Sequence, residues 1–365
     1  MTYFDPKIQE SDFALSSYDY TLPFSAIAQN PANPRERAKL LIYQRDSGRI
    51  IHSDFYHFCD FVPKDTLLVF NDTRVIKARI YAHKLDCNTQ KLSDKTFEIF
   101  YHKPLQSTSS AIPLFLVQIK GRVKCGDKLL INTDSTNPFL IAQVQECLDN
   151  GLRVVSFMQN EHTLEYIQVL DMLEKYGHTP LPPYIKREDS CQDAHFYQSV
   201  FSKQLGSIAA PTASLHFSKE SIESIKAQFE TCFLTLHIGA GTFMNVESAD
   251  IRHHLIHKEF FSLSPQSAAA IQNAHKVLCI GTTRARCVEY YARYKILQGE
   301  CDIFLYPSKS FKRVDYLLTN FHLPKSTLMM LVSAMVGREK CLELYKLALE
   351  KGYRFYSYGD GMLIL

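Results

Sequence analysis

Short apolar runs separated by turn signals dominate the chain from residue 65 to about residue 157. The runs read TLLVF, FEIFYH, LFLVQI, KLLI, FLIAQV and RVVSFM. Glycine turns divide them, such as CGD at residues 125–127 and DNG at residues 149–151. Because apolar residues do not recur at a helical period in this stretch, the pattern predicts a small β-barrel or β-sandwich.

Helical and strand-like patterns alternate after this stretch. Apolar residues recur at helical spacing within residues 163–176, and Gly177 follows as a helix stop. The run FLTLHIG precedes a glycine turn, and Ser264 and Pro265 provide an N-cap and a proline at the first helical position. The run VLCIG leads through two threonines into a helix near Arg284, and DIFLY follows as a further strand. The alternation predicts an α/β layer, which the N-terminal residues complete because they hold too little core of their own.

The composition is that of an ordinary soluble enzyme. With 365 residues, of which 46% are hydrophobic, the chain is long enough for roughly two domains of ~150 residues each. No apolar run approaches ~18 residues, so no membrane span is expected, and the first residues lack the basic and apolar pattern of a signal peptide. Ten cysteines without a C-x-x-C pair indicate free thiols in a reducing compartment and argue against a structural zinc site. We therefore expect a cytoplasmic protein.

The charge of the whole chain says little about a nucleic-acid partner, because the net charge is only +3. Local clusters of basic residues change that picture. They occur within residues 74–84, 120–128, 252–258 and 309–313. Each cluster taken singly is an ordinary solvated face, but several of them near candidate loops are what a phosphate backbone requires.

Residues 315–327, read as DYLLTNFHLPKST, crowd polar side chains between apolar neighbours. Pro324 closes the loop, and Ser326 is a good N-cap for the apolar helix expected over residues 328–336. The free N–H groups and the positive dipole end of such a helix favour an anion. A polar loop that merely caps a core helix explains one such segment, but further segments of this kind lie elsewhere in the chain.

The further segments are NDTRV at residues 71–75, PLPPYI at 180–185, AAPTASLHF at 209–217, LHIGAGTF at 236–243 and the closing YRFYSYGDGMLI at 353–364. Together with TNFHLP, and with DYTLPFSAIAQNP near the start, they resemble the S-adenosylmethionine:tRNA ribosyltransferase-isomerase family of queuosine biosynthesis. The resemblance covers nearly the whole chain, and its motifs are long and not shared with common folds. The family usually has glycine where this chain has Ser214 and proline where it has Asn245, and neither difference removes a functional group.

The resemblance implies an α/β main domain formed by residues 1–72 and 158–365, with an all-β, barrel-like smaller domain of residues 73–157 inserted into it. It also implies a reaction in which S-adenosylmethionine donates its ribosyl moiety. The ribose passes to the aminomethyl group of 7-aminomethyl-7-deazaguanine at the wobble position of the tRNA anticodon and rearranges to give epoxyqueuosine-tRNA, while adenine and methionine leave. S-adenosylmethionine is thus consumed as a substrate, so the expected partners are this donor and tRNA, without a cofactor, a metal or a membrane. We expect a monomer.

Such a reaction needs a base beside the sulfonium and an acid for the departing adenine. Histidine suits proton transfer because its usual pKa lies near neutral pH, and the catalytic candidates of this type are His216 and His322. The carboxylate candidates are Asp72, which follows an apolar run, and Asp360 in the closing YGDG. A hydrogen-bonded structural histidine and an Asx turn are equally ordinary explanations of these residues. The sequence leaves open which residue is the base and which the acid.

The remaining candidates are divided between the donor and the RNA. Residues that offer N–H groups, hydroxyls, an amide, a ring or a positive charge to S-adenosylmethionine are Arg74, Thr212, Gly239, Gly241, Thr242, Thr282, Thr283, Arg286, Asn320 and Tyr358. The basic candidates for tRNA contacts are Arg79, Lys309, Lys312 and Arg313. A glycine loop alone is also explained by a tight turn, and an arginine by a salt bridge.

Two other classes of protein compete with this interpretation. His254, His257 and Glu259 are possible ligands for zinc or iron in a metal-dependent hydrolase, but three ligands within six residues and no evident distant fourth make a poor cage. A noncatalytic RNA-binding protein is the second alternative. It is disfavoured because the polar motifs are scattered in the manner of an enclosed site and no RNP-like aromatic signature is present. A serine hydrolase is also disfavoured, since the sequence has no G-x-S-x-G elbow.

Overall fold

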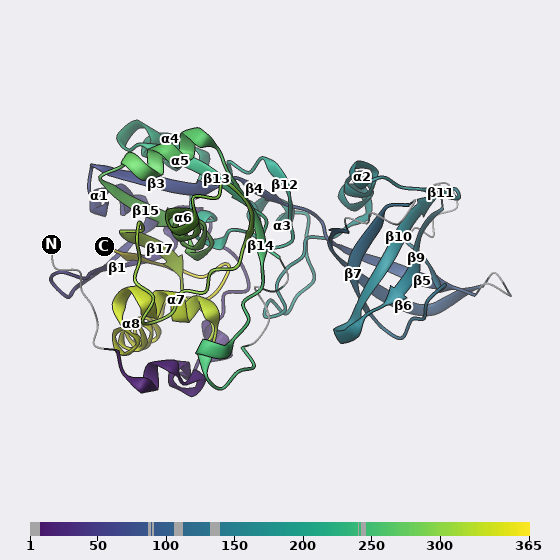
Figure 1. The fold of residues 1–365 in the computed structure, drawn as a ribbon, viewed down its shortest axis with the longest axis horizontal. Coiled ribbons are helices and arrows are strands. Elements are labelled where there is room, and N and C mark those ends of the chain that lie inside the picture. Colours follow the sequence, from purple (N-terminus) through teal and green to yellow (C-terminus); the bar gives the residue numbers. More distant parts are fainter. Residues whose placement is uncertain are drawn as a thin grey trace. The chain divides into compact units, whose positions relative to one another are not determined.

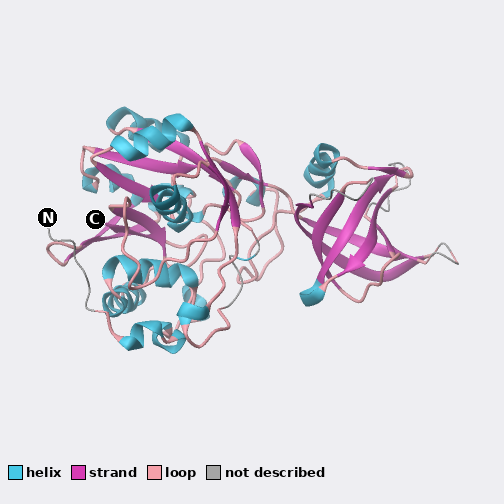
Figure 2. Ribbon diagram, in the orientation of Figure 1, coloured by secondary structure: helices cyan, strands magenta, loops and turns pink. Residues whose placement is uncertain are grey.

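The computed structural model describes residues 8–86, 89, 91–105, 112–131, 139–239, 241 and 246–365 (Figures 1 and 2). The chain divides into two compact units. The first comprises Met1–Arg74, Pro182–Glu188 and His195–Leu365, and the second comprises Val75–Leu181 and Asp189–Ala194. In the described part of the chain, no helix is long and apolar enough to cross a membrane.

A nine-stranded mixed sheet forms the centre of the first unit. Its strand order is β16-β14-β13-β3-β15-β17-β18-β1-β2. The bounds are β1 Lys39–Gln44, β2 Arg49–Asp54, β3 Thr66–Asn71, β13 Thr231–Leu236, β14 Glu259–Leu263, β15 Lys276–Ile280, β16 Gln298–Cys301, β17 Tyr316–Asn320 and β18 Gly361–Ile364. The four adjacent strands β13, β3, β15 and β17 run parallel. Their carboxyl ends therefore meet at one edge of the sheet, which is where open α/β sheets bind ligands.

Alternation along the strands divides the apolar residues between the two faces of this sheet. In β3, Leu67 and Val69 belong to the core on one face, and Leu68 and Phe70 to the core on the other. Helices cover both cores and bury residues on both faces. The side of Leu67 carries α5 (Pro265–Asn273), α6 (Thr282–Tyr294), α7 (Thr327–Val336) and α8 (Arg338–Glu350), and the side of Leu68 carries α1 (Phe58–Phe61) and α4 (Lys219–Gln228). This two-sided coverage explains why the central strands read as almost continuous apolar runs.

The helix boundaries agree with their sequence signals. Ser264 caps α5 by accepting a hydrogen bond from Ser267 N, and Pro265 occupies the first turn. Ser326 caps α7 in the same way through Met329 N. The segment 302–306, DIFLY, is not a strand, so that prediction was wrong: β16 ends at Cys301 and the chain continues as a loop. Apolar side chains of this loop pack against the core without pairing to the sheet.

The second unit is a closed antiparallel barrel. Its strands are β5 Arg79–Leu85, β6 Leu92–Leu105, β7 Leu114–Lys120, β8 Lys128–Leu130, β9 Leu140–Cys147 and β10 Leu152–Gln159, with the short β11 His162–Thr163 beside β10. Pairing between β10 and β9 closes the ring. Phe115, Val117 and Ile119 are buried at every second position of β7, as expected for a barrel wall. The predicted fold class, an α/β main domain with a barrel-like all-β domain, is confirmed.

The limits of the second unit differ from the expected insert of residues 73–157. Helix α2 (Tyr166–Tyr176), which ends before Gly177 as predicted, belongs to the barrel unit. The chain after α2 is tied to β5, because His178 N donates to Arg79 O at 2.7 Å. The remaining short elements are α3 (Asp193–Phe196), β4 (Thr73–Val75) and β12 (Gln204–Ser207).

Candidate active site

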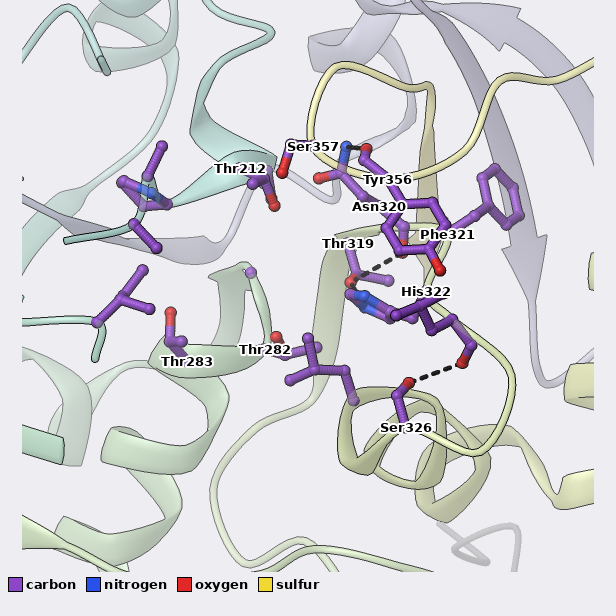
Figure 3. Close-up of a pocket in the computed structure, with 18 of the residues that line it drawn as sticks. Thr212, Thr282, Thr283, Thr319, Asn320, Phe321, His322, Ser326, Tyr356 and Ser357 are labelled. Carbon is purple, nitrogen blue, oxygen red and sulfur yellow. Dashed lines mark hydrogen bonds between the residues drawn. The ribbon is translucent and has the colours of Figure 1, made fainter. Parts of the chain in front are cut away.

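A cavity lies in the first unit at the carboxyl ends of β15 and β17 (Figure 3). The empty space within and in front of it, open solvent at its mouth included, amounts to about 740 Å³. Residues 209–213, 281–284, 319–323 and 356–357 contribute most of its wall. Four of the segments singled out in the sequence therefore meet around one space, and the predicted site residues Thr212, Thr282, Thr283, Asn320 and His322 all line it.

Helix α6 points its N-terminus at the cavity. Gly281 takes a positive φ of 110° at the cap position, and a Cβ built on it would approach the Arg284 guanidinium to 2.5 Å, so glycine is required here. Arg284 is 1% exposed and lines the cavity. Its Nη1 donates to Thr283 Oγ1 at 3.0 Å and its Nη2 to Ser214 Oγ at 2.7 Å. Burial lowers the pKa of Arg284 to about 9, so the guanidinium is charged at neutral pH.

His322 follows β17 and lies on the cavity wall. Its ring Nε2 is 2.7 Å from Thr319 Oγ1, which leaves Nδ1 as the ring nitrogen available to a ligand. Its backbone N–H donates to the Tyr345 hydroxyl at 3.2 Å. Burial lowers the pKa of His322 to about 3. The imidazole is therefore neutral at pH 7, with a proton on one ring nitrogen and the other nitrogen able to accept one.

Asn320 connects the cavity to His216, which lies behind the wall. The Asn320 amide nitrogen donates to Tyr356 O at 3.1 Å and contacts His216 Nε2 at 3.2 Å. Because the Tyr356 carbonyl can only accept, that amide atom must be nitrogen, and His216 Nε2 must be an unprotonated acceptor. Burial, with the positive charges of Arg354 and Arg35 in addition, lowers the pKa of His216 to about 3. His216 is thus neutral, stacked 4.0 Å from the Phe55 ring, and oriented toward Asn320.

Tyr356 adopts a left-handed backbone conformation with φ of 70°, which is rare for a bulky side chain. Its N–H donates to Phe321 O, and its carbonyl accepts from Asn320 and from Gly359 N. These bonds hold the strained residue in place, as is common at functional sites. The Tyr356 hydroxyl and Asn320 Oδ1 are both buried without a hydrogen-bond partner, and both residues line the cavity.

The two predicted catalytic carboxylates lie outside the residues that line the cavity. Asp360 accepts from the backbone N–H groups of Lys39 and Arg354 and forms an ion pair with the Arg354 side chain, so it joins β1 to the C-terminal turn. Asp72 accepts from the Thr235 hydroxyl at 2.6 Å, beyond the end of β3. In this structure Asp72 thus links the segment after β3 to β13, and Asp360 links the C-terminal turn to the start of β1.

The one arginine of α6 that the sequence predicted for the donor, Arg286, is already paired. Arg286 Nη1 lies 2.6 Å from Glu259 Oε2, and both side chains are buried. Gly239 N donates to Glu259 Oε1, and Gly241 packs closely on His257. Tyr358, a predicted ring for stacking, is buried edge-to-face against Tyr197 and does not line the cavity. Thr242 lies outside the described residues.

Among the described residues, no group of three or more His, Cys, Asp or Glu side chains could hold a metal ion. The cluster considered in the sequence has other partners. Glu259 has His257 Nε2 at 3.5 Å but pairs with Arg286 at 2.6 Å, and His254 packs edge-to-face on Phe304. The structure therefore offers no support for the metal-dependent hydrolase.

The predicted tRNA contacts are not among the residues that line the cavity. Arg79 belongs to the barrel unit, where it donates to Leu181 O, and Arg74, a predicted contact of the donor, is exposed. Lys309 and Lys312 are exposed, whereas Arg313 caps the end of α5 by donating to Ile271 O and Ala274 O. The run 309–313 precedes β17, so it lies at the amino edge of the parallel strands, opposite the cavity.

Two important cavity residues were missed in the sequence, Arg284 and Tyr356. Arg284 and Arg286 are two positions apart, so they point to opposite sides of α6, and only the packing of α6 decides which one faces the cavity. Tyr356 carries no signal in the sequence, because its left-handed conformation depends on bonds to Phe321 and Asn320, which are distant in the chain.

Comparisons with known proteins show the family of the chain. The family model described as "Queuosine biosynthesis protein" matches residues 15–364. S-adenosylmethionine:tRNA ribosyltransferase-isomerases from Helicobacter acinonychis and Campylobacter jejuni are 50% and 51% identical, each alignment covering 97% of this chain and 99% of the relative. A crystal structure of an S-adenosylmethionine tRNA ribosyltransferase from Thermotoga maritima is 28% identical, with a TM-score of 0.50 over 96% of this chain and 100% of that chain. The family expected from the motifs is confirmed, and with it an enzyme of the transferase class. The chain belongs to the queuosine biosynthesis protein family, among relatives named S-adenosylmethionine:tRNA ribosyltransferase-isomerases.

Proposed function

We propose that this protein transfers the ribosyl moiety of S-adenosylmethionine to tRNA and isomerises it. In the reaction that the family resemblance implies, the acceptor is the aminomethyl group of 7-aminomethyl-7-deazaguanine in the anticodon wobble position. The product is epoxyqueuosine-tRNA, and adenine and methionine are released. The observation that carries the proposal is the similarity of about half of all residues over 97% of the chain to relatives named for this activity.

The cavity suits the donor better than the RNA. It combines a buried positive charge at Arg284 with hydroxyl, amide and imidazole groups at Thr282, Asn320 and His322. S-adenosylmethionine carries a carboxylate, a ribose diol and a purine that need such partners.

His322 is the residue that we propose to accept the acidified hydrogen beside the sulfonium. Its neutral imidazole has Nδ1 free for this purpose, while Thr319 holds Nε2. The positive sulfonium would oppose protonation further, so the proton must pass on rapidly. The histidine is therefore a transient carrier: its protonated form is a strong acid and can pass the proton to the departing adenine, which needs one.

His216 does not line the cavity and acts through Asn320. We propose that it positions Asn320, because its unprotonated Nε2 accepts from the amide and turns Asn320 Oδ1 toward the cavity. The predicted roles of Asp72 and Asp360 in proton transfer stay predictions. So does the assignment of donor contacts to Arg74, Gly239, Gly241, Thr242, Arg286 and Tyr358.

Binding of tRNA, a monomeric state and a cytoplasmic location are further parts of the proposal. The described cysteines are all free thiols, which fits a reducing compartment. S-adenosylmethionine serves as a substrate rather than a resident cofactor. The protein is proposed to need no metal.

The test is to incubate the protein with S-adenosylmethionine and an anticodon stem-loop that carries the deazaguanine precursor, and to measure both released products. We expect adenine and methionine in equal amounts, and neither of them from a stem-loop with ordinary guanine. A parallel incubation with EDTA should give the same rate. Release of S-adenosylhomocysteine would indicate methyl transfer and contradict the proposal, and loss of activity to the chelator would contradict the metal-free mechanism.

A further inference from the structure

A buried positive charge without a negative partner stands at the wall of the cavity. Arg284 is 1% exposed, yet no described carboxylate forms an ion pair with it. The other two arginines of α6 differ, because Arg286 pairs with Glu259 and Arg293 with Glu289. An isolated buried ion is costly to the fold, so its presence calls for a partner that the free protein lacks.

The hydrogen bonds of Arg284 direct its charge toward the cavity. A guanidinium has five N–H donors, and the neighbouring hydroxyls of Thr283 and Ser214 accept one each. Its Nε is buried without a partner. Because Thr283 Oγ1 accepts from Arg284, its own hydrogen is directed elsewhere, and Thr283 lines the cavity (Figure 3). The hydroxyl thus becomes a donor polarised by a cation.

The backbone adds to this positive potential. Helix α6 has 13 residues, and no side chain caps its N-terminus at Gly281. The first N–H groups of a helix lack partners within the helix, and the dipole gives this end a partial positive charge. Thr282 and Thr283, which begin the helix, are both buried at the cavity wall.

A second set of atoms indicates independently that the cavity holds a ligand. Asn320 Oδ1 and the Tyr356 hydroxyl are buried there without a hydrogen-bond partner. Leaving such atoms unsatisfied costs stability, so they are expected to bond a polar ligand. Asn320 Oδ1 can only accept, which suits an ammonium or hydroxyl group.

We propose that Arg284, the Thr283 hydroxyl and the N-terminus of α6 bind the carboxylate of the methionine moiety of S-adenosylmethionine. The inference rests on the proposed function, since that function supplies the ligand. Arg284 thereby replaces Arg286, the arginine expected from the sequence, as the charge that holds the donor. A tRNA phosphate is a poorer fit, because a side chain that is 99% buried is beyond the reach of a polymer backbone on the surface.

The test compares two ligands and two arginines by titration calorimetry. One ligand is S-adenosylmethionine, and the other is its decarboxylated analogue, which keeps the sulfonium, ammonium and adenosine. The unmodified protein should bind the carboxylate form roughly 10–100-fold more tightly, the range for hydrogen bonds to charged groups. Arg284→Met should lose that preference, because its affinity for S-adenosylmethionine alone should fall. Its affinity for the analogue should change less than about threefold. Arg293→Met, on the same helix but paired with Glu289, should keep the preference.

Thermal unfolding separates this role from a structural one. Removing an unpaired buried cation should leave the melting temperature of the free Arg284→Met protein unchanged or raise it. Removing Arg293 should lower the melting temperature, because a buried carboxylate loses its partner. Thr283→Val provides a milder variant, for which a smaller loss of the same preference is expected.

Each contrary result has a defined meaning. Equal affinity of the unmodified protein for both ligands, or an equal loss of both in Arg284→Met, would refute the carboxylate site. If Arg284→Met lost stem-loop binding but kept its affinity for S-adenosylmethionine, the charge would bind an RNA phosphate instead. This result would also refute the carboxylate site. A protein that releases adenine but shows no carboxylate preference would refute the site and keep the proposed function. A protein that shows the carboxylate preference but never releases adenine would support the site and refute the proposed function.

Discussion

At the scale of single residues, burial decides what the candidate groups can do. Histidine is attractive in a sequence because its usual pKa is about 6.5, yet burial lowers the pKa of both His216 and His322 to about 3. Both stay neutral as the pH falls from 8 to about 5. A neutral imidazole suits proton acceptance and hydrogen-bond acceptance, so the environment favours the role of base or positioning group over that of a resting acid.

Replacing His322 by alanine should lower the single-turnover rate of adenine release by roughly 10²–10⁴-fold, because a positioned proton acceptor contributes about that much. The affinity for tRNA should stay nearly unchanged. His275→Ala serves as the control, since this exposed histidine pairs with Asp65 at the opposite edge of the sheet and should keep its rate. The profile of the unmodified protein between pH 5.5 and 8 should lack an inflection near pH 6.5. Such an inflection, if removed by His322→Ala, would contradict the lowered pKa.

At the scale of elements, local signals predicted more than long-range ones. Ser264 and Ser326 mark their helices because an N-cap bond involves residues only three apart. The loop at residues 302–306 looked like a strand because its apolar residues contact the core, but whether a strand pairs is decided by its neighbours in the sheet. The position of Asp360 is likewise decided by a distant neighbour. Its carboxylate accepts from the backbone N–H of Lys39, 321 positions away in the chain, and it does not line the cavity. The motifs could thus be found from the sequence, but the direction in which their side chains point could not.

The caps of α5 and α7 offer a matched pair for separating stability from binding. Ser264→Ala and Ser326→Ala should each cost about 1 kcal/mol in the free energy of unfolding by urea, since each removes one N-cap bond. Ser326 also lines the cavity and donates to Leu323 O at 2.8 Å. Only Ser326→Ala should therefore weaken S-adenosylmethionine binding, by roughly 2–10-fold. Equal effects of both variants on binding would mean that the cap acts through global stability.

At the scale of the main unit, the direction of the parallel strands places the basic run at residues 309–313 and the cavity at opposite edges of the sheet. From the sequence alone, they are expected to be close together. Lys312 and Asp315 stand before β17, and Asp315 N donates to Val277 O near the start of β15. The cavity stands at the far end of both strands. At about 3.3 Å per residue, the eight positions from Lys312 to Asn320 span roughly 26 Å if extended. Strand order cannot be read from single motifs, so the sequence placed this basic run near the site.

Two exposed lysines distinguish which edge of the sheet meets tRNA. Lys325 lies beside the cavity residue Ser326 and forms an exposed ion pair with Asp19, which holds it only weakly. Lys309 lies at the opposite edge, over the Tyr306 ring. Because the anticodon base must reach the cavity, Lys325→Ala should weaken stem-loop binding and reduce the slope of log affinity against log salt by ~1. Lys309→Ala should match Lys219→Ala, a control on the exposed face of α4. If Lys309→Ala instead reduced the slope and Lys325→Ala did not, the RNA would contact the amino edge, as predicted from the sequence, and the anticodon would have to approach the cavity from that side.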